Sequence, residues 1–106
     1  MKNIETAKIL ELKEQVQYQE GQIVSKTLVQ NQSVSLTLFA FDKGEEISSH
    51  ASHGDAMVCV LDGIAEITIG SEKYKVNAGE TIVMPAETPH AVFALDKMKF
   101  MLTVIF

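Results

Sequence analysis

The residues of this sequence best suited to chemistry are its three histidines, His50, His53 and His90. Imidazole is a frequent ligand of divalent transition metals, and it transfers protons near neutral pH. His50 and His90 each lie in a stretch that also carries spaced glycines, and a proline precedes His90. If the fold brings these two stretches together, they predict a site for a metal ion or for a small ligand.

The glycine, proline and histidine positions of the two stretches follow a known pattern. The matching positions are Gly44, His50, Gly63, Gly79, Pro85 and His90. Through them the sequence resembles the cupin superfamily, and within it the RmlC-like proteins of the cupin 2 conserved barrel type. The resemblance implies an all-β fold, the cupin double-stranded β-helix or jelly-roll barrel. It also implies one cupin domain over residues 1–106, with an N-terminal extension over 1–21 and the barrel over 22–106.

The sequence departs from the family at the metal ligands. In cupins, two histidines and one glutamate of the first motif join the histidine of the second motif around one divalent ion. His50 and His90 match the first and last of these ligands, whereas Ser52 stands at the second histidine position and Ala56 at the glutamate position. A hydroxyl ligates weakly and a methyl group cannot ligate, so the resemblance implies a reduced site with two histidines, or three if His53 joins them.

The direction of His53 decides between two and three histidines. Residues two apart on a regular strand share a side, so His53, three residues after His50, is expected to point outward. A loop or bulge near Gly54 would turn it inward. Three imidazoles suit Zn, Ni, Fe or Mn and leave a coordination position open, with Asp55 as a further candidate ligand. The alternative is that His50 and His90 form a hydrogen-bonded polar patch and His53 is a solvated loop residue.

An apolar pocket is expected beside these groups. If Ala56 points inward, as its motif position implies, Val58 does so too, and Met84 is their expected companion. Ser52 and Asp55 would then orient a ligand through polar contacts. The alternative, in which Val58 and Met84 are ordinary core residues, stays open.

Glu87 stands where the second motif of the family has a glycine. Pro85 and Pro89 restrict the backbone on either side of it, so we expect this segment to aim His90. The Glu87 carboxylate is expected to be solvated. It would act as a general base only if its pKa were raised.

Composition excludes several classes of partner. The net charge is −5 and all nine basic residues are lysines. Without a basic stripe we expect no nucleic-acid partner, and without arginine no planar clamp for a carboxylate or phosphate. Cys59 is the only cysteine, so no internal disulfide can form. The apolar runs are too short to span a membrane and the N-terminus lacks the apolar core of a secretory signal, so we expect no membrane partner and a cytoplasmic location.

Short segments rich in Val, Ile, Phe and Thr, separated by Gly, Asn and Asp, predict strands from residue 22 onward. The expected strands are 22–29, 33–41, 45–49, 55–61, 64–69, 72–76, 81–84, 90–95 and 97–105. Asp62-Gly63 is the strongest hairpin signal, and Gly70-Ser71 is a second one. Upstream, the spacing of Ile9, Leu12 and Val16 predicts a short amphipathic helix within 4–17 or, alternatively, an edge strand over 7–11.

Several of these strands are apolar on both faces, so their second faces also need to be covered. This pattern predicts a homodimer. The function expected overall is that of a small-molecule-binding cupin, with a divalent ion or without one. The alternatives are a metal-dependent enzyme of the oxygenase, isomerase or decarboxylase type, and a metal-free lyase or cyclase that uses histidine as acid or base.

Overall fold

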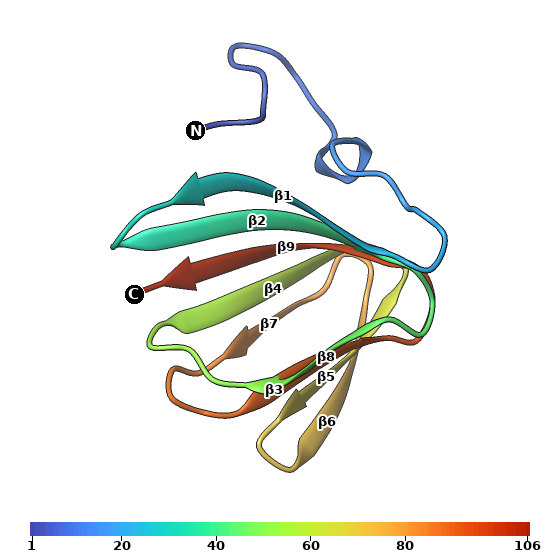
Figure 1. Ribbon diagram of the computed structural model, residues 1–106, viewed down its shortest axis with the longest axis vertical. Helices are drawn as coiled ribbons and strands as arrows, with labels where there is room; N and C mark the ends of the chain where they lie inside the picture. The colour runs from blue at the N-terminus through green and yellow to red at the C-terminus, as the bar shows by residue number, and fades with distance from the viewer.

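The computed structural model describes residues 1–106 and contains nine strands and one short 3₁₀ turn (Figure 1). The turn, η1, is Leu12–Glu14. The strands are β1 Ile23–Gln30, β2 Val34–Phe41, β3 Glu46–His50, β4 Asp55–Asp62, β5 Ile64–Ile69, β6 Glu72–Asn77, β7 Thr81–Met84, β8 His90–Ala94 and β9 Met98–Ile105. Every predicted strand is present, and its ends lie within one residue of the expected ones.

The strands form two antiparallel sheets that face each other as the walls of a barrel (Figure 1). The five-stranded sheet has the order β1-β2-β9-β4-β7, and the four-stranded sheet has the order β3-β8-β5-β6. Strands far apart in the chain are therefore neighbours, as β3 and β8 are. The predicted all-β jelly-roll fold is confirmed.

The hydrophobic core lies between the two sheets. On β4, Ala56, Val58 and Val60 are at most 2% exposed, and they alternate with residues that are half-buried. On β8 of the opposite wall, His90 shares the buried face with Val92 and Ala94. Alternation along these strands therefore places one histidine on the inner face of the barrel.

Gly63 turns the chain between the two walls. Its φ is +74°, and a Cβ at this position would overlap with the backbone carbonyl of Lys97, so only glycine fits. The predicted Asp62-Gly63 hairpin is nevertheless wrong, because β4 and β5 belong to different sheets and do not pair. The second turn signal, Gly70-Ser71, does close a hairpin, between β5 and β6.

The N-terminal segment, residues 1–22, has one short element, the 3₁₀ turn η1, in place of the predicted helix or edge strand. The segment runs along the β1 side of the five-stranded sheet, away from the four-stranded sheet (Figure 1). Several of its apolar residues pack on the outer face of the five-stranded sheet. This outer cluster comprises Val16, Leu28, Leu38 and Ala40, with Ile4, Leu12 and Tyr18 among the residues packed against it. The N-terminal segment therefore covers part of the outer apolar face of the five-stranded sheet. The structure contains no helix with the length and hydrophobicity of a membrane span.

Tyr18 and Lys99 fasten this segment to the barrel. The Tyr18 hydroxyl donates a hydrogen bond of 2.6 Å to the Asp62 carboxylate. The Lys99 ammonium donates one of 2.6 Å to the Lys13 carbonyl and lies 4.8 Å from the centre of the Tyr18 ring. Burial raises the pKa of Tyr18 above its ordinary value, and the bond to Asp62 raises it further.

Candidate metal centre

His50 and His90 meet across two neighbouring strands. His50 is the last residue of β3, His90 is the first residue of β8, and the two are direct partners in the antiparallel ladder. Their Nε2 atoms are 3.1 Å apart and their ring centres 4.4 Å apart, with the rings inclined at 72°. The fold thus brings together the two histidines that the two motifs supply.

An irregularity in β3 turns His50 toward its partner. Ile47 pairs with Val92 and His50 pairs with His90, so β3 uses three steps where β8 uses two. One extra residue is therefore inserted between Ile47 and His50. Because an extra residue reverses the side to which later residues point, it places His50 on the same face as the buried His90.

Backbone carbonyls fix the tautomer of both rings. His50 Nδ1 lies 3.0 Å from the Ser48 carbonyl oxygen, and His90 Nδ1 lies 3.2 Å from the Thr88 carbonyl oxygen. Since a carbonyl oxygen can only accept, each Nδ1 carries the hydrogen and donates it. In the neutral rings both Nε2 atoms are then bare, and their lone pairs face each other. Metal-binding histidines are commonly held in this way, with the second ring nitrogen bonded to a backbone carbonyl or a carboxylate.

The environment of His90 favours the neutral form of its ring. Only 3% of His90 is exposed, whereas His50 is exposed. Burial lowers the pKa of His90 below its ordinary value and the neighbouring His50 lowers it further, while the Thr88 carbonyl acts in the opposite direction. A neutral imidazole is the form that binds a metal ion.

The spacing of the two nitrogens fits one shared divalent ion. Two imidazole nitrogens at about 2.0–2.1 Å from one ion, with an angle of about 90–109° between them, lie roughly 2.8–3.4 Å apart. The observed separation of 3.1 Å falls within this range. The distance between the two nitrogens is therefore the one that a shared divalent ion requires.

A model of the cupin domain matches residues 37–106 of the chain. The chain belongs to the cupin family. The resemblance carried by the two motifs is thereby confirmed.

Solved structures agree with this assignment. This cupin is similar to a conserved protein of unknown function from Streptococcus pyogenes, with 50% identity, a TM-score of 0.96 and coverage of 97% of this chain and 90% of that one. A cupin superfamily protein from Desulfitobacterium hafniense shares 28% identity at a TM-score of 0.94, over 99% and 96% of the two chains. The cupin spans about half (47%) of a cupin 2 conserved barrel domain protein from Leptotrichia buccalis, at 39% identity, a TM-score of 0.88 and 92% coverage of its own length. A comparison with curated proteins found no match.

The cupin does not bring His53 to the histidine pair. The His53 side chain is 91% exposed, and its Nδ1 lies 2.9 Å from the Glu87 carboxylate. No group of three or more His, Cys, Asp or Glu residues is arranged to hold a metal ion. The physical reason is that His53 lies in the loop between β3 and β4, where strand alternation no longer sets its direction, and its ring is turned to the Glu87 carboxylate.

Ser52 and Asp55 make hydrogen bonds that shape the loops. The Ser52 hydroxyl donates to the Gly54 carbonyl at 2.6 Å, and the Asp55 carboxylate accepts from the Ala86 amide at 2.8 Å. Sequence reasoning did not foresee either bond, because both depend on how the two loops meet in space. Their role toward a ligand stays a prediction.

The three apolar residues expected to line a pocket belong to the core of the cupin. Ala56, Val58 and Met84 are at most 2% exposed and pack in the main hydrophobic cluster. Ala56 and Met84 are also direct partners between β4 and β7. They contribute an apolar wall on the inside of the barrel, and their contact with a ligand stays a prediction.

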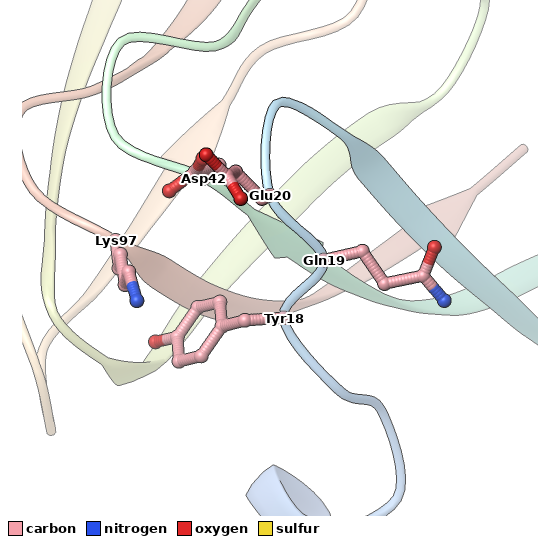
Figure 2. Close-up of a pocket in the computed structure, with 5 residues that line it drawn as sticks. All are labelled: Tyr18, Gln19, Glu20, Asp42 and Lys97. Carbon is pink, nitrogen blue, oxygen red and sulfur yellow. The ribbon is translucent and has the colours of Figure 1, made fainter.

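A separate polar hollow lies at the other end of β3 and β8. It has a volume of about 370 Å³ and is lined by Tyr18, Gln19, Glu20, Asp42 and Lys97 (Figure 2). Asp42 is engaged in holding a turn, because its carboxylate accepts bonds from the amides of Gly21 and Lys43. These bonds lower the pKa of Asp42 below its ordinary value. Sequence reasoning did not find this hollow, since the N-terminal segment that forms one side of it has no regular structure.

Proposed function

We propose that this protein is a small-molecule-binding cupin in which His50 and His90 hold one divalent ion. The observation that supports this proposal most strongly is the pair of bare Nε2 atoms at 3.1 Å, with both Nδ1 atoms tied to backbone carbonyls. Two facing lone pairs at this separation repel each other unless a cation or a shared proton lies between them. The structure around the pair therefore favours a cation.

Only two protein ligands serve this site, so most coordination positions are left for water and for a bound molecule. A bound ion would act as a Lewis acid toward oxygen atoms of that molecule. His90 holds its nitrogen on the buried side and His50 on the exposed side, so the molecule would approach from the end of the barrel where β3 ends and β8 begins. The nitrogen ligands suit Zn, Ni or Fe, with Mn as a further candidate.

Metal uptake by protein purified without an affinity tag and stripped of ions tests the proposal. Titration with Zn, Ni, Fe or Mn, followed by elemental analysis, is expected to give about one ion per chain. His50→Ala and His90→Ala are each expected to abolish this uptake. His53→Ala is the matched control and is expected to retain it. Uptake that survives both of the first two changes would place the ion elsewhere, and the absence of uptake with every ion would contradict the proposal.

A further inference from the structure

Two loops lie next to each other at the ends of the strands that carry His50 and His90, and hydrogen bonds join the two loops. Residues 51–54 connect β3 to β4, residues 85–89 connect β7 to β8, and the loops lie side by side (Figure 1). The Glu87 amide donates to the Ser52 carbonyl at 2.8 Å, next to the bond between Ala86 and Asp55. The contact between His53 and the Glu87 carboxylate, 2.9 Å long, completes this junction.

Glu87 adopts a backbone conformation that is unfavourable for its residue type. Its φ is +62°, in the left-handed region where a Cβ is crowded. It is the only residue other than glycine with a positive φ outside the N-terminal segment. Glycine, the residue of the family motif at this position, would adopt this conformation without strain.

Stability does not explain why a glutamate occupies this position. The side chains of His53 and Glu87 are 91% and 67% exposed, and exposed ion pairs contribute little to folding. The strain of the backbone acts against folding as well. Strain of this kind concentrates at functional sites, where the side chain is needed for something other than packing.

We propose that His53 and Glu87 form an acid–base dyad at the mouth of the barrel. The Glu87 carboxylate accepts the Nδ1 hydrogen of His53, which fixes the tautomer and leaves Nε2 bare and open to solvent. This is the relation that a carboxylate and a histidine have in catalytic triads. His53 Nε2 can then take a proton from a bound molecule, and the imidazolium that forms is paired with Glu87 until the proton is returned.

The dyad lies within reach of the proposed ion site, and this part of the inference rests on the proposed function. His53 is three residues from His50 and Glu87 is three residues from His90, so each Cα is at most about 11 Å from that of the nearer histidine. A molecule that uses oxygen atoms to fill the open positions of the ion, and that carries a removable proton, would meet both groups. Small hydroxy and oxo acids have this chemistry.

Acylation of the ion-free protein by p-nitrophenyl acetate tests the dyad without a metal. His53 Nε2 attacks the ester carbonyl, p-nitrophenolate leaves, and water then hydrolyses the acetylimidazole to acetate and restores the histidine. His53→Gln is expected to remove most of the p-nitrophenolate released above background. Glu87→Gln keeps the shape but not the charge, and it is expected to slow the reaction by roughly ten-fold.

Two controls separate this role from a structural one. Glu72→Gln removes an exposed carboxylate on β6, and it is expected to react as fast as the wild type. Glu87→Gly is expected to melt at the same temperature as the wild type or at a higher one, because strain is relieved, and to react slowly. A Glu87→Gln rate equal to that of the wild type, a slow rate for Glu72→Gln, or a lower melting temperature for Glu87→Gly would overturn the proposal. None of these readouts requires an ion, so failure of the dyad is distinguishable from failure of the metal site.

Discussion

His50 and His90 form one pair but experience different surroundings. His90 is buried and its neutral form is favoured, whereas His50 is exposed at the end of β3. The buried ring is therefore the one whose protonation the fold opposes. An ion bound between the two rings would be anchored by His90 and reached from the side of His50.

The lowered pKa of His90 predicts that the ion-free protein loses stability in mildly acidic solution. Below the ordinary pKa of 6.5 the unfolded chain binds a proton at His90 that the folded chain does not bind, so the free energy of unfolding falls as the pH drops from 6.5 toward the lower pKa of the folded state. Urea unfolding of the wild type and of His90→Gln at several pH values measures this loss. The loss is expected in the wild type and is expected to be smaller in the variant.

Two carboxylates make the stability depend on pH in a separate, more acidic range. Hydrogen bonds to backbone amides lower the pKa of Asp42 and of Glu80 below their ordinary values of 3.8 and 4.5. Their contribution to the free energy of unfolding is complete above those pH values and is lost only as the pH falls further. If the wild type and His90→Gln lost stability equally between neutral pH and the onset of this range, the account of His90 would be wrong.

At the residue scale, the sequence identified the histidine pair but not its geometry. The motif positions of His50 and His90 were enough to place both rings in one region of the barrel. The bulge in β3 and the carbonyls that fix the two tautomers had no signal in the sequence, because both depend on the pairing of β3 with β8. The contact between His53 and Glu87 was not foreseen for the same reason. The only signal in the sequence for this contact was that Glu87 replaces the glycine of the family motif.

At the scale of elements, the N-terminal segment depends on a few polar anchors, since it lacks regular hydrogen-bonded structure beyond η1. Tyr18→Phe removes the bond to the Asp62 carboxylate while keeping the ring beneath Lys99. Because hydrogen bonds to charged groups contribute about 1.5–3 kcal/mol, we expect the free energy of unfolding to fall by about that amount, measured by urea denaturation.

Tyr74→Phe is the matched control for this change. Tyr74 is the only other tyrosine, and it lies 42% exposed on β6. The free energy of unfolding of the Tyr74→Phe variant should stay within about 0.5 kcal/mol of the wild-type value, as for most surface changes. Equal stabilities of Tyr18→Phe and the wild type would show that the Tyr18 hydroxyl does not fasten the segment.

The strands were predictable and the N-terminal segment was not, for one physical reason. Strand segments are rich in β-branched and aromatic residues, and turn residues delimit them. The apolar residues of the N-terminal segment have a spacing close to that of a helix, but Val16 and Leu12 pack on a sheet while Ile9 is fully exposed. Tertiary contacts therefore override the local pattern. The turn at Gly63 shows the same limit, because the sequence located the turn but not the change of sheet that it makes.

At the scale of the whole molecule, part of the outer face of the five-stranded sheet remains apolar and uncovered. Val83 and Ile105 lie on this face beyond the N-terminal segment, and Phe106 follows at the end of β9, each of them between 51% and 57% exposed. The homodimer predicted from the two-faced strands would bury this area, and it stays a prediction.

Light scattering coupled to size-exclusion chromatography tests the homodimer. We expect the mass of two chains for the wild type and of one chain for Val83→Lys, because a charge on the uncovered face opposes its burial. The matched control is Ser71→Lys, in the exposed turn between β5 and β6, and it is expected to leave the mass unchanged. A monomeric wild type at micromolar concentration would contradict the prediction.

The central claim is that one ion lies between His50 and His90, and an anomalous difference map from crystals grown with zinc tests it most directly. We expect a single strong peak on each chain within about 2.0–2.1 Å of both Nε2 atoms, with the remaining positions filled by water or by a bound molecule. A map without a peak at this place, in crystals where the two Nε2 atoms remain as close as they are here, would contradict the claim.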